Sequence, residues 1–236
     1  RYLPDGDEIL FKWLEEEGHR RPFLLYYHYR DLHLPYDPGS PFEEMYLPAA
    51  FSSPLGIWGR IRWFLAREKI DLVKKNVMIL RGDLDFDNFD HPWVEALYDG
   101  EIRRLDERFF KRLRETLGAL HLDRNTFVVI SADHGEELMD HGLVGHVSTY
   151  REGRLYDEVI RIPLILWYPG VIRDGVVVEE VVQNIDIVPT ILDLLQLEQP
   201  PELPGQSLMP LVNDTGSWRR RPAFLETSGG GYTANQ

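Results

Sequence analysis

Continuous apolar runs of strand length alternate with helix-like segments along this chain, and that alternation limits the folds it can adopt. The three strongest runs read RPFLLYYHY at 21–29, FVVISA at 127–132 and IPLILWYPG at 162–170. Runs that are apolar throughout, without alternation, are typical of strands buried on both faces of a parallel sheet. We therefore predict an α/β fold with a mainly parallel sheet and helices packed against it.

Helical patterns fill the intervals between these runs. Residues 7–17 form an amphipathic segment that ends at Gly18. Between Pro92 and Leu120 the apolar residues recur at spacings near three and four, which predicts a long helix. Its apolar positions are Leu97, Ile102, Leu105, Phe109, Phe110, Leu113 and Leu117. A further helix is expected from about Asp186, and strands are expected at 176–183 and 221–227.

The length of 236 residues allows one large domain with a proper core. We predict a single domain over residues 1–236, in which residues 37–92 form a variable insertion or loop region. The tryptophans in and beside that region fit a helix core better than a surface on which a sugar stacks. They are Trp58, Trp63 and Trp93.

Composition narrows the classes of partner. The formal charge of −13 argues against nucleic acid, whose phosphates select basic surfaces. No run reaches the roughly 18 apolar residues of a membrane span, and the first residues lack a signal-peptide pattern. Without Cys the chain has no disulfide, thiolate metal site or Cys nucleophile. The compartment and the oligomeric state stay open.

A carboxylate and an imidazole follow the run at 127–132. Asp133 and His134 stand directly after it, and Gly135 permits a sharp turn of the backbone. This donor pair can bind one divalent cation and suits Zn²⁺, Mn²⁺, Fe²⁺ or a site dominated by Ca²⁺. Alternatively, Asp133 is the N-cap of a helix that begins at HGEEL. Both interpretations are open at this point, and a metal would need one or two further carboxylates.

Histidines stand in the loops after two of the predicted strands. His33 follows the run at 21–29, and His141 and His146 lie within 13 residues of Asp133. Reactive groups in parallel α/β sheets gather beyond the carboxyl ends of strands, so these loops can share one site. His33 would then donate a hydrogen bond to a substrate oxygen. Taken singly, each histidine is equally well explained as a surface loop residue.

Five segments follow one another in an order that is known from a protein family. They are RPFLLYYHYRDLHLPYDP, LYDGEIRRLDERFFKRL, TFVVISADHGEELMDHGLVGH, LYDEVIRIPLILWYPG and NIDIVPTILDLLQLEQPPELPGQSLMPLV. The first resembles the pattern H-x-x-D-P-H-x-P-Y, with Leu32 in place of the usual Pro, and the third resembles T-x-V-I-x-x-S-D-H-G-E. Together the five segments resemble the sulfatase family of the alkaline-phosphatase-like superfamily.

The resemblance implies a three-layer α/β/α sandwich, incomplete here at the N-terminus and at the C-terminus. It implies that Asp133 and His134 bind the catalytic cation, expected to be Ca²⁺, or Mn²⁺ or Zn²⁺ if the enzyme transfers phosphoryl groups. His33 and His146 are expected to contact the ester, as electrophilic helper or leaving-group acid. The expected substrate is a small-molecule or carbohydrate sulfate ester. Asp186 is expected to be structural and to start its helix.

The family's nucleophile is not found in this sequence. Relatives carry a formylglycine, made from Cys or Ser in C/S-x-P-S-R, near the N-terminus, with acidic metal ligands just before it; this chain has no such motif. We therefore expect an incomplete polypeptide, inactive by itself, from a metal-dependent sulfuric ester hydrolase. One alternative is a phosphoryl-ester or phosphonate hydrolase, or a phosphoethanolamine-type transferase, on the same fold. Another is a non-catalytic sulfatase-like binding domain.

Overall fold

A computed structural model describes residues 6–30, 32–34, 36–47, 78, 91–146, 148–149, 153–213 and 217–227. The chain divides into two compact units. The first unit comprises residues 1–122, 135–161 and 227–236, and the second comprises residues 123–134 and 162–226. Most of the predicted insertion at 37–92 lies outside the described residues, as do Trp58 and Trp63. No helix in the described ranges is long and apolar enough to cross a membrane.

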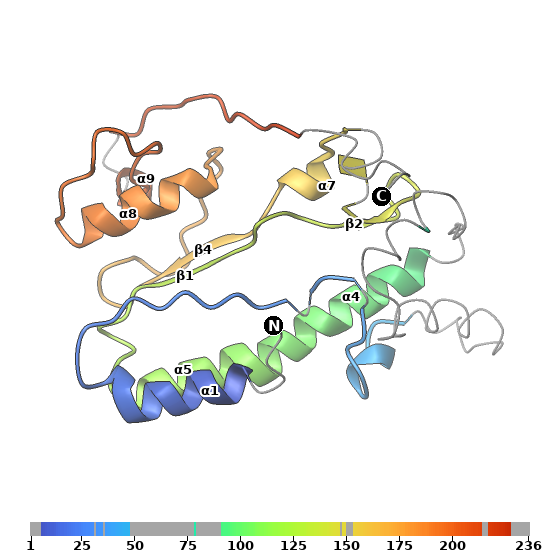
Figure 1. The fold of residues 1–236 in the computed structure, drawn as a ribbon, viewed down its shortest axis with the longest axis horizontal. Helices are drawn as coiled ribbons and strands as arrows, with labels where there is room; N and C mark the ends of the chain where they lie inside the picture. The colour runs from blue at the N-terminus through green and yellow to red at the C-terminus, as the bar shows by residue number, and fades with distance from the viewer. Residues whose placement is uncertain are drawn as a thin grey trace, which may run out of the picture. The chain divides into compact units, whose positions relative to one another are not determined.

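Two helical rods lie side by side in the first unit (Figure 1). The first rod is α1 (Gly6–Trp13), which continues into the π-helical turn η1 (Leu14–Gly18). The second runs through α4 (His91–Leu105), the π-helical segment η4 (Asp106–Phe110) and α5 (Lys111–Ala119). Their shared core is aromatic, with the rings of Phe11 and Phe109 at 5.8 Å, and Glu8 forms an ion pair with Arg112. Both helices predicted in this unit are confirmed.

A second core of the same unit surrounds the start of α4. It includes the short helix η2 (Phe42–Glu44) and the two-stranded antiparallel sheet of β2 (Glu137–Leu138) and β3 (Val144–Gly145). The buried apolar residues are Leu34, Tyr36, Trp93, Val94, Leu97, Met139, Leu143 and Val144. Trp93 is therefore a core residue, as its helical spacing indicates.

The segment at 21–29 differs from its prediction. It is extended, but it belongs to no strand of the described sheets. Phe23, Tyr27 and Tyr29 pack against the aromatic core of the helical rods, whereas Leu24 and Tyr26 are 87% and 86% exposed. The expectation of a strand buried on both faces is wrong here, because only one side of the extended chain meets the helices.

The second unit contains the pair formed by β1 (Val128–Ser131) and β4 (Leu164–Trp167), which run together in Figure 1. The pairing is antiparallel, with Val128 opposite Trp167 and Ser131 opposite Leu164. The chain thus re-enters the sheet at the end where β1 leaves it, whereas a parallel partner would begin at the other end. The predicted strands exist and the fold is α/β, but only two-stranded antiparallel sheets occur in the described part, not the mainly parallel sheet of a sandwich.

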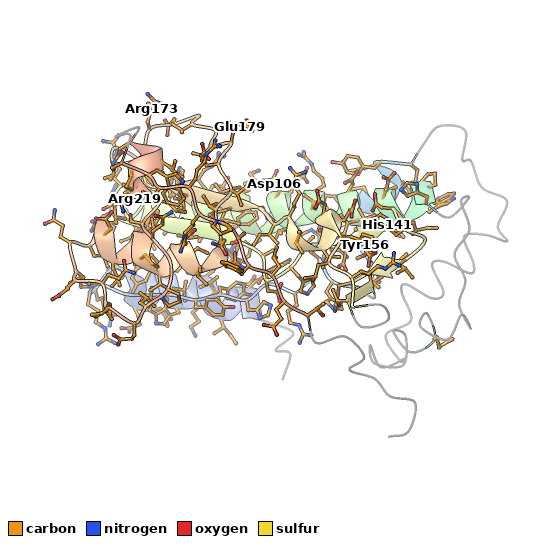
Figure 2. All side chains as sticks on the ribbon, turned by 90° about the horizontal axis from the view of Figure 1, so that it is seen from above. Asp106, His141, Tyr156, Arg173, Glu179 and Arg219 are labelled. Atoms are coloured by element: carbon orange, nitrogen blue, oxygen red, sulfur yellow. The ribbon has the colours of Figure 1, made fainter. Side chains whose placement is uncertain are left out.

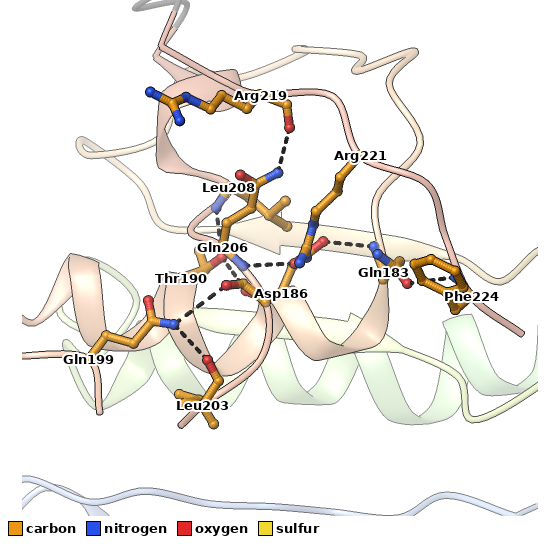
Figure 3. A network of polar contacts seen from close by, with 11 residues as sticks. Gln183, Asp186, Thr190, Gln199, Leu203, Gln206, Leu208, Arg219, Arg221 and Phe224 are labelled. Atoms are coloured by element: carbon orange, nitrogen blue, oxygen red, sulfur yellow. Dashed lines mark hydrogen bonds and ion pairs between the residues drawn. The ribbon is translucent and has the colours of Figure 1, made fainter. Parts of the chain in front are cut away.

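A buried carboxylate organises the rest of the second unit (Figure 3). Asp186 ends the 3₁₀ turn η5 (Asn184–Asp186) that leads into α8 (Ile187–Leu194). Its fully buried side chain accepts the backbone N–H groups of Gln183 and Gln206, each at 2.9 Å, and forms an ion pair with Arg221. The structural role expected of Asp186, at the start of a helix, is confirmed.

The prediction of two further strands in this unit is wrong. Residues 176–183 and 221–227 carry no strand, and Val177 and Phe224 are 80% and 86% exposed. The Val-rich pattern of the first segment favours a strand only if a neighbouring strand can accept its hydrogen bonds. In the second segment, Arg221 instead bonds Asp186, and the N–H of Phe224 bonds the side chain of Gln183. The second unit also contains the short helix α9 (Met209–Val212).

Candidate active site

The turn that follows β1 presents a carboxylate and an imidazole side by side. Asp133 is 71% exposed, and its Oδ1 accepts the backbone N–H of His134 at 3.1 Å. The preceding carbonyl, that of Ala132, accepts a hydrogen bond from the Asn184 amide at 3.3 Å. No helix begins at Asp133, since residues 135 and 136 are irregular and β2 follows. The alternative of an N-cap is therefore wrong.

The donor atoms of this turn fit a shared cation. His134 Nε2 lies 3.8 Å from Asp133 Oδ2. Two atoms that bind one ion at about 2.0–2.6 Å each can be this far apart, and oxygen plus nitrogen is a common ligand pair. Across the described residues, no group of three or more His, Cys, Asp or Glu side chains could hold a metal. Asp133 and His134 can therefore supply part of a ligand set.

Gly135 brings the chain close to the short helix α7 (Asp157–Ile160) in the first unit. Its N–H donates to the carbonyl of Val159 at 2.7 Å. A Cβ atom at this position would lie 2.0 Å from the carbonyl oxygen of Glu158, a contact that no side chain can make. Glycine is needed here for the close approach of two backbones, directly after the proposed metal-binding pair.

His33 and His146 lie together in the first unit, although they are far apart in the sequence. Their ring centroids are 5.1 Å apart with the planes at 74°, an edge-to-face contact. His33 Nδ1 lies 2.9 Å from the carbonyl oxygen of Leu34, which can only accept, so Nδ1 carries the proton. The Nε2 atom of His33 is the other ring nitrogen and lies on the side away from this carbonyl. The structure thus brings these two histidines together, while their roles stay a prediction.

Packing beneath the two rings holds them together. Leu34, next to His33, is buried in the same core as Val144. Gly145, next to His146, has φ +88°, and a Cβ atom there would lie 2.9 Å from Leu34 Cδ1. The carbonyl of His146 accepts a hydrogen bond from the Thr149 hydroxyl at 2.7 Å. The absence of a side chain at Gly145 therefore lets the two histidine loops meet.

Glu136 and Tyr36 belong to this site but were not found from the sequence. Glu136 Oε1 lies 3.7 Å from His146 Nδ1, and the two side chains are only 5% and 14% exposed. Burial raises the pKa of the Tyr36 hydroxyl well above its usual range, and the negative charge of Glu136 raises it further. Both residues stand within quoted motifs, but an acid after DHG reads as a solvated loop residue, and only tertiary packing shows that it is buried.

His141 has other partners. Its ring stacks on Tyr156 at 3.6 Å with the planes at 16°, and its Nε2 lies 3.2 Å from Glu158 (Figure 2). These contacts agree with its interpretation as a surface loop histidine. Asp133 and His134 belong to the second unit, whereas His33 and His146 belong to the first. The convergence of all four on one ion stays a prediction.

Comparisons with known proteins extend over most of the chain. Residues 2–197 match the family model described as "Sulfatase". Arylsulfatase K of Mus musculus is 27% identical over 241 residues, which cover 95% of this chain and 41% of the relative. The N-acetylglucosamine-6-O-sulfatase of Bacteroides thetaiotaomicron is 31% identical over 129 residues, covering 52% of this chain and 22% of the relative.

Solved structures show the same fold. The phosphonate monoester hydrolase SpPMH from Silicibacter pomeroyi superposes with a TM-score of 0.65 at 24% identity. The superposition covers 90% of this chain and 42% of that structure. The chain thus spans about two fifths of the length of the mouse relative and of this solved structure.

Proposed function

Because this chain belongs to the sulfatase family, we propose that the protein hydrolyses sulfate esters with the help of a divalent cation. The chain contributes Asp133 and His134 to the binding of that cation, and His33 and His146 to contacts with the ester. The observation that carries the proposal is the contact between the rings of His33 and His146 at 5.1 Å. Two imidazoles from distant loops that meet edge to face are suited to bind neighbouring oxygens of one anion.

The two histidines have distinct parts in the proposed reaction. The Nδ1–H of His33 donates a hydrogen bond to the Leu34 carbonyl. A second proton, carried on Nε2, can therefore pass to the oxygen of the departing alcohol. His146 donates from its ring to a sulfate oxygen and so stabilises the charge that builds up there. The cation, when bound, polarises the ester and offsets its negative charge. We assign no nucleophile within this chain, which has no Cys.

We infer that the substrate is a sulfated sugar or a small aryl sulfate. The relative from Bacteroides thetaiotaomicron is named for N-acetylglucosamine-6-O-sulfate hydrolysis, and the mouse relative is named an arylsulfatase. These names support the ester class but do not identify the alcohol, because specificity on a shared scaffold comes from variable loops.

The test compares esters on the intact protein, with 4-nitrophenyl sulfate, 4-nitrophenyl phosphate and phenyl phosphonate esters as substrates. We expect sulfate ester turnover that EDTA abolishes and that Ca²⁺ restores. Removal of a general acid commonly lowers the rate about 10²–10⁴-fold, so His33→Ala should lose activity on that scale. His141→Ala is the matched control, because its ring lies on Tyr156 and should leave the rate within about twofold of wild type.

Three outcomes would contradict this proposal. A preference for phosphate or phosphonate esters would place the protein in the phosphoryl branch of the fold. Turnover that survives EDTA would remove the cation from the reaction. Absence of turnover on every ester, in protein that is folded and metal-loaded, would favour a non-catalytic binding role.

A further inference from the structure

We propose that Glu136 is a positioning residue for His146, and that it directs Nε2 of this imidazole toward the ester, as the Leu34 carbonyl does for His33. The proposal deepens the function proposed above, because it concerns the group that binds the ester. It rests on four residues of the first unit, in the order Tyr36, Glu136, His146 and His33. Each of them lies next to the one that follows.

The contact between Glu136 and His146 is buried. Glu136 Oε1 and His146 Nδ1 are 3.7 Å apart, and the side chains are 5% and 14% exposed. A carboxylate taken out of water is costly unless a positive or hydrogen-bonding group offsets its charge. His146 Nδ1 can supply that group: the contact is an ion pair when the imidazole is protonated, and at 3.7 Å it becomes a hydrogen bond only if the two side chains move closer together. Glu136 therefore favours the ring orientation in which Nδ1 faces inward and carries a proton.

The neighbours of Glu136 fix its place from the other sides. The Tyr36 side chain is fully buried, and the charge of Glu136 contributes to the raised pKa of its hydroxyl. Gly145 adds no side chain, and a Cβ atom there would already lie 3.4 Å from Glu136 Oε1. The carboxylate is thus enclosed between Tyr36 and the backbone that carries His146. Little room is left for the carboxylate to turn away from the imidazole.

The two imidazole rings are then oriented in the same way. His33 directs Nδ1 to the backbone carbonyl of Leu34, and His146 directs Nδ1 to the carboxylate of Glu136. In an imidazole the two nitrogens stand on opposite sides of the ring, so each histidine offers Nε2 on the side away from its own partner. The pair can donate from two Nε2 atoms to separate oxygens of one sulfate group. The two acceptors differ: Leu34 offers a neutral carbonyl, whereas Glu136 offers a carboxylate that also forms an ion pair with His146 when the imidazole is protonated.

The test is nitrogen NMR on the intact protein with ¹⁵N-labelled histidine, at pH 9, where a free imidazole is neutral. Chemical shifts of Nδ1 and Nε2 report which nitrogen carries the proton. Wild type should show His146 in the Nδ1–H form. Glu136→Leu removes the acceptor at similar volume and should shift His146 toward the Nε2–H form. Glu136→Gln keeps an oxygen acceptor and should restore part of the wild-type signal.

Glu137→Gln is the matched control, because Glu137 is the next residue and is also buried. Its carboxylate accepts the backbone N–H of Ser148 at 3.2 Å. This variant should lose stability without a change in the His146 tautomer, which separates a general packing effect from positioning. In kinetics, Glu136→Leu should lower kcat about 10- to 100-fold, as for other residues that orient a reactive histidine, with KM within about twofold.

An unchanged His146 tautomer in folded Glu136→Leu would overturn the proposal. So would an equal shift in Glu137→Gln. If the tautomer shifts as expected in a protein that hydrolyses no ester, Glu136 keeps its positioning role and the proposed function fails instead. The nitrogen spectrum therefore tests this inference separately from the activity.

Discussion

Gly145→Ala tests whether backbone geometry brings the two histidine loops together. Gly145 has φ +88°, in the left-handed region, where an L-residue costs about 1–2 kcal/mol. A Cβ atom would also lie 2.9 Å from Leu34 Cδ1, and Leu34 is only 3% exposed. Overpacking of this kind costs about 1–3 kcal/mol. The sum predicts a loss of about 2–5 kcal/mol in the free energy of unfolding.

Gly142→Ala is the matched control for this prediction. Gly142 has φ +74°, but a Cβ atom there would meet nothing within 4 Å. Its cost should therefore be the backbone term alone, about 1–2 kcal/mol. Urea unfolding, followed by circular dichroism, measures both variants. Equal losses at the two positions would refute the reasoning, because the contact with Leu34 would then contribute nothing.

Two further predictions concern buried polar groups. Asp186→Asn removes a charge that Arg221 and two backbone N–H groups depend on, and should cost about 3–5 kcal/mol of unfolding free energy. By contrast, Glu180→Gln breaks only the exposed ion pair with Arg220 and should cost at most about 1 kcal/mol. Equal losses of stability in the two variants, measured by thermal unfolding, would contradict the role of Asp186 in its hydrogen-bond network. Tyr36 should stay neutral at a pH where exposed tyrosines ionise, so the stability it provides should be lost only as the pH rises above about 10, through its raised folded pKa. Ultraviolet titration of wild type against Tyr36→Phe measures this, and a Tyr36 that titrates with the other tyrosines would show that it is not buried.

Elements set by local periodicity were predictable from the sequence. The helix at 91–119 carries its apolar spacing over many residues, so the pattern determines the buried face before any partner is known. The turn after β1 was also predictable, because Asp133 and His134 end an apolar run and Gly135 follows them directly. Asp186 combined an acidic residue with the start of a helical pattern, and in the structure it lies where the 3₁₀ turn η5 leads into α8, as expected.

Features that depend on partners distant in the sequence were not predictable. An apolar run such as 21–29 does not show whether strands will flank it. In the described chain, one side of this segment packs against helices while the other side is exposed. The antiparallel direction of β1 and β4 follows from where the intervening chain returns, which no local pattern records. Glu136 was missed for the same reason, since its burial depends on the packing of Leu34 against Gly145.

We propose that Asp133 and His134 bind a divalent cation, and that His33 and His146 contact the anionic ester which this cation polarises. The most direct measurement is a crystal structure of the intact protein with Mn²⁺ and a non-hydrolysable sulfate analogue. We predict an anomalous peak bound by Asp133 and His134, with an oxygen of the analogue within about 3 Å of Nε2 of His33 and of His146. An ion at Asp133 with both imidazoles on a different face of the molecule would contradict the account.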